Sequence, residues 1–210
     1  MPNASPQSLI NNKSVLFKLF LTNYIDMLAF GIFVPIVPFL FSDKAPGIFF
    51  DSYNQQELKV LYGWLLAVFS ICSMIGSPLI GAASDKLGRK KLLAFAYTIN
   101  SISYVTMALG VYGVSLFMLF IGRIIPGLVG NTQITIQSAL ADVSDERSKA
   151  KNFGITGISF GLGFVSGVLI FIVLRKFGYS FTQAYLLAAF LNFTNLFFFK
   201  CLCTRNYSEK

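Results

Sequence analysis

Six long apolar stretches, separated by polar links, constrain the fold of this chain more than any other feature of its sequence. They lie near residues 15–41, 58–83, 91–111, 115–140, 153–174 and 181–200. A helix needs about 20 residues to cross roughly 30 Å of hydrocarbon, and each stretch is long enough to do so. Strands of a membrane barrel are excluded, because they are only about ten residues long and alternate in polarity. The sequence therefore predicts an all-α membrane protein with six transmembrane helices.

The amino-acid composition supports a membrane protein and argues against other classes. Only 12% of the residues are charged, whereas a soluble domain has about 25%. The net charge of +8 does not indicate nucleic acid as a partner, because the basic residues cluster at the ends of apolar stretches. The sequence has no histidine and no recognisable catalytic or nucleotide-binding arrangement. We therefore expect the lipid bilayer as the main partner, with no metal, no cofactor and no enzymatic activity.

The distribution of Lys and Arg predicts the orientation of the chain. With both termini on one side of the membrane, that side carries 12 of these residues and the other side carries 4. The positive-inside rule then places both termini in the cytoplasm, in a cell inner or plasma membrane. We expect cytoplasmic tails at residues 1–14 and 201–210, with a helical bundle at 15–200. The first three and last three helices are predicted to form a 3+3 inverted repeat.

Two charged residues, Asp26 and Arg123, lie inside apolar stretches. A charge at mid-bilayer costs about 2.5–3.5 kcal/mol on insertion scales, so it normally faces a water-filled cavity or a polar partner. Asp26 follows Lys18 by eight residues, which places it roughly 12 Å into the bilayer. We interpret Asp26 as a carboxyl group that binds and releases a proton. The alternative is a structural polar contact with a neighbouring helix.

Arg123 keeps its charge at any working pH, so it cannot itself carry the proton. It can attract an anion, hold a carboxylate ionised, or pair with Asp26. Asn23 is three residues from Asp26 and shares a helical face with it, and Arg123, Gly127 and Asn131 share another face at steps of four residues. We expect these side chains to line a central cavity, although hydrogen bonding between helices is the alternative.

Prolines and glycines are predicted to shape the helices. Pro35, Pro38 and Pro126 each lack a backbone N–H, so they should bend or loosen their helices. For the first two, a gate at the outer end of the first helix and simple kinked packing both remain possible. Gly127, Gly163 and Gly167 are small residues that let helices approach closely.

A basic turn, GAASDKLGRKK at residues 81–91, joins the second and third stretches. Its candidate gate residues are Gly81, Asp85, Gly88, Arg89 and Lys90. The glycines are predicted to permit close packing and a tight turn. We place Asp85 beyond the end of the second helix and near the start of the third, where the helix dipole favours a carboxylate. Arg89 is expected to pair with Asp142, just past the fourth helix.

The turn resembles the motif G-x-x-x-D-x-x-G-R-[RK] between helices 2 and 3 of the major facilitator superfamily. The stretch from Arg123 to Asn131 is similar to the family's helix 4 motif, R-x-x-x-G-x-x-[GA]. Residues 26–38 resemble the first helix of tetracycline/proton antiporters, and residues 141–154 their loop between helices 4 and 5. The resemblance implies the N-terminal half of a transporter that couples efflux of a drug-like or lipophilic small molecule to protons by alternating access.

The chain departs from this pattern in two respects. In the exporters, helix 5 carries a Gly-Pro pair followed by Gly, but residues 163–167 read GFVSG and have no proline. In addition, the family's transporters have two six-helix bundles, and in them the Asp85 position contacts the second bundle. We therefore expect a second six-helix half as partner, either a separate chain or another copy. The alternatives are a truncated, non-transporting half-bundle and a facilitator of a small metabolite without proton coupling.

Overall fold

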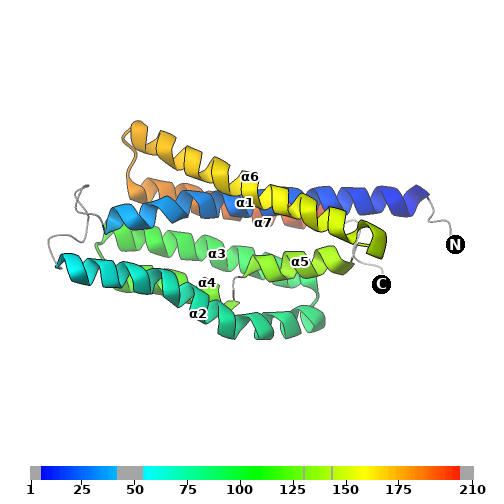
Figure 1. Ribbon diagram of the computed structural model, residues 1–210, viewed down its shortest axis with the longest axis horizontal. Helices are drawn as coiled ribbons and strands as arrows, with labels where there is room; N and C mark the ends of the chain where they lie inside the picture. The colour runs from blue at the N-terminus through cyan, green and yellow to red at the C-terminus, as the bar shows by residue number, and fades with distance from the viewer. Residues whose placement is uncertain (1–5, 42–53, 130, 143, 204–210) are drawn as a thin grey trace.

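The computed structural model describes residues 6–41, 54–129, 131–142 and 144–203, and within them the chain forms helices and no strand. The helices are α1 (Pro6–Leu40), α2 (Gln55–Leu87), α3 (Arg89–Tyr112), α4 (Leu116–Val129), α5 (Thr132–Asp142), α6 (Glu146–Lys176) and α7 (Phe181–Cys203). Figure 1 shows them aligned along one axis in an elongated bundle, with the start of α1 and the end of α7 toward the same end of the bundle.

Five spans in the described residues are long and apolar enough to cross a membrane. The fourth of them combines α4 and α5 and runs from Leu116 to Asp142. The sixth predicted stretch forms α7, which has 23 residues and contains the buried Asn192 and Asn195. The prediction of an all-α integral membrane protein is confirmed, and the predicted helices are all present.

The fourth predicted helix is not continuous. α4 ends at Val129 and α5 begins at Thr132, so residues 115–140 form two helices instead of one. Pro126 lies in the last turn of α4, where it removes a backbone hydrogen bond, and Asn131 is not helical. Non-helical backbone is tolerated at membrane depth only where protein or a cavity surrounds it. The break therefore indicates where a polar site lies.

The turn between α2 and α3 also differs from the prediction. α2 continues through polar residues to Leu87, so Asp85 lies inside its last turn and not beyond its end. Gly88 alone separates the two helices, and its φ of 84° is one that glycine adopts without strain. α2 thus ends where the backbone adopts a positive φ at Gly88, and not where the apolar residues end. At the same end of the bundle (Figure 1), α1 begins at Pro6, within the segment predicted as a tail.

The packing of the helices repeats with inverted orientation. α1 packs chiefly against α6, and α4 packs chiefly against α2. Likewise, the contact of α3 with α4 corresponds to that of α7 with α1, while α3 and α7 pack against each other. In these contacts α1, α2 and α3 of the first half take the places of α4, α6 and α7 of the second half. The first and fourth spans run in opposite directions (Figure 1), so the 3+3 inverted repeat is present.

Glycines bring α1 and α6 into backbone contact. A Cβ on Gly167 would overlap the carbonyl oxygen of Leu28 and lie 2.8 Å from the Cα of Gly31. A Cβ on Gly163 would lie 2.8 Å from the Cβ of Met27. Any larger side chain would separate the two helices, so the predicted close approach at Gly163 and Gly167 is what the structure contains.

α2 and α4, the pair that corresponds to α6 and α1 in the inverted repeat, are also held close together at glycines. A Cβ on Gly127 would lie 2.7 Å from the Cβ of Cys72, and one on Gly76 would overlap the carbonyl oxygen of Leu128. Gly127 was predicted as a packing residue, whereas Gly76 was missed.

Candidate functional site

A cavity of about 310 Å³ lies inside the bundle, beside the break between α4 and α5. Every helix from α1 to α6 contributes to its lining. Four residues predicted from the sequence line it, namely Asp26, Arg123, Pro126 and Asn131. The remaining lining is mostly aromatic or weakly polar, including Phe69, Tyr104, Gln133 and Phe160. The structure therefore brings the two intramembrane charges to one cavity, although they are 97 positions apart in the sequence.

The carboxylate of Asp26 is 5% exposed and accepts a hydrogen bond of 2.5 Å from the Thr132 hydroxyl. Thr132 is the first residue of α5. A helix N-terminus has unsatisfied N–H groups and a partial positive charge, both of which favour an anion nearby. Sequence reasoning missed Thr132, because it assumed a continuous helix there and so offered no helix start. The broken helix gives Asp26 a partner without neutralising its charge.

The guanidinium of Arg123 is held between two aromatic rings. Its Cζ lies 4.3 Å from the ring centre of Phe33 and 4.5 Å from that of Phe69. The residue is 7% exposed, and within the described residues its Nε has no hydrogen-bond partner and the side chain forms no ion pair. The pairing with Asp26 that we considered is not formed. Cation–π contact thus holds a permanent charge beside the cavity without a counter-ion.

Asn131 lies at the break between α4 and α5 and is hydrogen-bonded to α2. Its side-chain N–H donates to the hydroxyl of Ser73 over 2.7 Å, and the residue lines the cavity as predicted. This bond joins the non-helical residue to the neighbouring helix. It replaces one of the contacts that a continuous helix would have made within its own backbone.

Asn23, in contrast, does not line the cavity. It is fully buried, and its Nδ2 donates to the carbonyl of Thr156 at 3.1 Å and to the Ser159 hydroxyl at 2.6 Å. Its Oδ1 accepts a hydrogen bond of 2.7 Å from Gln133. Asn23 therefore ties α1 to α5 and α6, which is the structural alternative that we considered for it. The helical face shared with Asp26 was correct, but α6 covers that part of the face.

The prolines of α1 do not interrupt the helix. Pro35 and Pro38 both lie inside α1, which continues to Leu40. Between them Ile36 and Val37 are fully buried. This end of α1 is therefore packed as part of the core, and a gating role for the two prolines stays a prediction.

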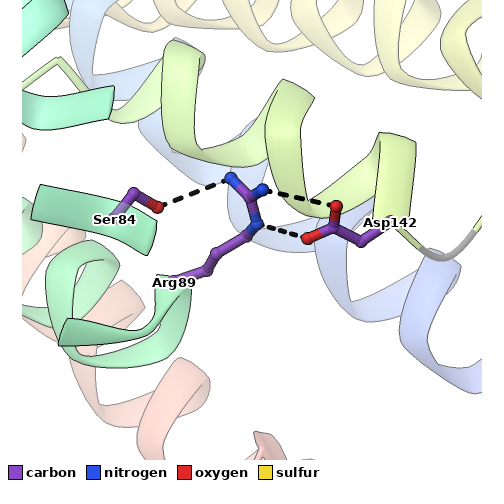
Figure 2. Close-up of polar contacts among 3 residues, drawn as sticks. All are labelled: Ser84, Arg89 and Asp142. Carbon is purple, nitrogen blue, oxygen red and sulfur yellow. Dashed lines mark hydrogen bonds and ion pairs between the residues drawn. The ribbon is translucent and has the colours of Figure 1, made fainter. Parts of the chain in front are cut away.

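The predicted pair at the α2–α3 turn is present. Figure 2 shows the Arg89 guanidinium directed at both carboxylate oxygens of Asp142 and at the hydroxyl of Ser84. Arg89 is the first residue of α3, and Asp142 is the last residue of α5. The N–H groups of Arg89 donate to the Asp142 carboxylate in a bidentate arrangement, which defines direction as well as charge. The pair joins helices from the two halves of the inverted repeat.

The other residues of the turn differ in how the structure places them. Gly88 has the positive φ that the predicted tight turn needs. A Cβ on Gly81 would meet nothing within 4 Å, so the close packing predicted for Gly81 is absent in this bundle. The side chains of Asp85 and Lys90 lie outside the described part, and their roles remain predictions.

The fold, the broken fourth span and the basic turn together define a transporter-type helical bundle. The chain matches the family model of the Major Facilitator Superfamily over residues 19–210, and it belongs to this family. Its members are membrane transporters and not enzymes. Among solved structures, it resembles the human organic anion transporter MFSD10 (TETRAN), with a TM-score of 0.74 and 23% identity over 91% of this chain and 47% of that one.

Two curated relatives are resistance proteins. The tetracycline resistance protein, class H, of Pasteurella multocida is 33% identical over 159 residues, which are 76% of this chain and 37% of that protein. The quinolone resistance protein NorA of Staphylococcus aureus (strain MRSA252) is 31% identical over 157 residues, 74% of this chain and 37% of that protein. The chain thus matches a little over a third of the length of these relatives.

Proposed function

We propose that this chain forms the N-terminal half of a proton-coupled antiporter that exports a drug-like small molecule. The observation that carries the proposal is the cavity in which Asp26 and Arg123 are both buried and not paired with each other. Buried charges inside a membrane are costly, and they mark ion and substrate pathways. Relatives named for tetracycline and quinolone resistance support export of aromatic compounds.

The charge of the cavity depends on a proton at Asp26. With Asp26 ionised, its charge and that of Arg123 cancel, and with Asp26 protonated the cavity holds one positive charge. A basic or hydrogen-bond-donating group of the substrate competes with the proton for the same carboxylate. The aromatic lining, with Phe30, Phe69 and Phe160, suits the apolar part of such a molecule. Exchange of proton for substrate follows, because the two ligands exclude each other.

The cavity needs a second wall. In the proposed mechanism, a second six-helix half faces this bundle, and rocking of the two halves exposes the cavity to each side in turn. This half is supplied by a separate chain, by a second copy, or by further sequence of the same protein. The proposed orientation has both termini in the cytoplasm. Basic residues are concentrated at the start of α1, in the α2–α3 turn, at the start of α6 and at the end of α7, and Figure 1 shows these helix ends at one end of the bundle.

Replacing Asp26 by Asn should abolish proton-driven transport and leave binding in place. Asn keeps the shape and accepts the Thr132 hydrogen bond, but it cannot exchange a proton. The measurement is tetracycline accumulation in everted membrane vesicles under an imposed pH gradient, with the chain co-expressed with the C-terminal half of the class H tetracycline protein. Accumulation should fall at least tenfold, while binding without a gradient stays within about threefold.

The controls separate the alternatives. Asp26→Glu keeps an ionisable group and should retain part of the activity. Unchanged pH dependence in Asp26→Asn would contradict proton coupling and favour a facilitator. If the wild-type chain transports neither alone nor with the added half, the chain is a non-transporting half-bundle.

Replacing Asp142 by Asn should weaken the proposed cytoplasmic gate without unfolding the protein. Both partners are partly exposed, with 24% of the Arg89 side chain and 50% of the Asp142 side chain accessible. Exposed ion pairs contribute about 0–1 kcal/mol, so the unfolding free energy should change by less than about 1 kcal/mol. The single cysteine of the Ser84→Cys variant, in a background lacking native cysteines, should nevertheless react faster with a water-soluble maleimide. Equal reaction rates with and without Asp142→Asn would contradict a gating role.

A further inference from the structure

A second hollow lies on the outer surface of the bundle, away from the charged cavity. It has a volume of about 610 Å³ and is formed by the C-terminal half of α2, the start of α3 and the end of α4. Ile80 and Leu92 are buried at its base, while Leu79, Leu87 and Phe95 are at least half exposed along its sides. No acidic residue lines it, and Lys91 is the single charged residue among its lining.

The end of α4 contributes to this groove. α4 ends at Val129, and Leu128 and Val129 form one wall of the groove. Pro78 lies inside α2 just before the residues that form the opposite wall. Along α2 the groove extends from Leu79 to Leu87, eight residues or about 12 Å of helix. The groove therefore extends along α2, and a helix that crosses the membrane lies in the general direction of the acyl chains.

The charged residues at the groove are basic, and Lys91 is exposed and can bind an anion. Lys91 lies in the first turn of α3 and is exposed, as is Lys86 at the end of α2. Arg89 beside them is bound to Asp142, but within the described residues Lys91 forms no ion pair. A lysine buries its apolar stem along the groove and presents its ammonium at the membrane surface. The arrangement is complementary to a ligand with an apolar chain and an anionic head.

We propose that this groove, which we call the α2–α3 groove, binds an anionic phospholipid. One acyl chain lies against Ile80, Leu92 and Phe95, and the phosphate lies at Lys91. The phospholipid then lies between the C-terminal half of α2, the start of α3 and the end of α4. A basic residue near an anionic membrane surface contributes about 1 kcal/mol of attraction, which corresponds to roughly a fivefold preference over a zwitterionic lipid.

The proposal is tested by quenching of a single tryptophan by brominated lipids. Trp64 is the sole tryptophan of the chain. The variant Trp64→Phe/Phe95→Trp moves the indole into the groove. In vesicles, dibrominated phosphatidylglycerol should quench this indole with an apparent affinity about fivefold above that of dibrominated phosphatidylcholine. Addition of Lys91→Gln should bring the ratio close to one.

Two controls accompany this measurement. Lys176→Gln removes an exposed lysine at the other end of the bundle and should leave the ratio unchanged. The unmodified chain reports on Trp64, which is 58% exposed on α2 outside the groove, and should show no preference for either lipid. Equal quenching by both lipids at position 95 would overturn the proposal. Absence of quenching there by either lipid would also overturn it, because protein would then cover the groove.

Discussion

Replacing Arg123 by Met is expected to abolish transport while the protein becomes as stable as the wild type or more stable. Arg123 is a buried charge without an ion pair or a hydrogen bond to its Nε in the described residues. Replacing buried charged groups by apolar ones of similar volume is often neutral or stabilising by about 1–4 kcal/mol. Met fills the space between Phe33 and Phe69 without the cost of removing a charge from water.

Opposite changes in stability and function would identify Arg123 as a functional residue. The measurement is thermal unfolding in detergent, together with the tetracycline accumulation assay with the co-expressed half. Arg123→Lys is the matched control, since a compact ammonium keeps the charge but loses the planar stacking on both rings. A large loss of stability in Arg123→Met would contradict the expectation and assign Arg123 to the core instead.

Replacing Gly167 by Ala should destabilise the bundle strongly, whereas Gly157→Ala in the same helix should not. The added methyl group at position 167 would overlap the Leu28 carbonyl oxygen, and backbone cannot move aside as a flexible side chain can. Overpacking of this kind costs typically about 1–3 kcal/mol. At Gly157 an added Cβ meets nothing within 4 Å, and Ala favours a helix over Gly by up to about 1 kcal/mol.

The two alanine variants differ by one methyl group at different turns of α6, so they form a direct comparison. The midpoint of thermal unfolding in detergent should fall by several degrees for Gly167→Ala and stay constant or rise for Gly157→Ala. If both variants unfold at the wild-type temperature, α1 and α6 are not in the backbone contact that the structure shows.

Much of the fold followed from the sequence because a bilayer allows few solutions. Apolar length located the membrane-spanning stretches, although the fourth of them forms two helices. Asp142 was correctly predicted as the partner of Arg89, because it is a carboxylate at the end of a neighbouring helix. The break after Val129 was not predicted, because Pro126 is tolerated within many membrane helices and apolar length carries no information on continuity. Once the break was missed, Thr132 could not be recognised as the start of a helix or as the partner of Asp26.

The placement of polar residues was predicted only in part. Asp26, Arg123 and Asn131 do line one cavity. Asn23 does not, since a helical face extends over several turns and the sequence does not say where a neighbouring helix covers it. The partners of Arg123 proved to be Phe33 and Phe69. With 23 phenylalanines in the chain, no pattern distinguished these two from the rest.

The pairing of α1 with α6 and α7 has a consequence for how the protein is made. α1 is translated before α6 and α7, which are its main partners. About 140 residues separate the end of α1 from the end of α6, which at 5–20 residues per second takes roughly 7–28 s. Until α5 and α6 have been made, Asn23 and Asp26 lack the hydrogen bonds that join them to these two helices. The newly made α1 therefore depends on the insertion machinery. It stays accessible to membrane proteases until α6 is being translated.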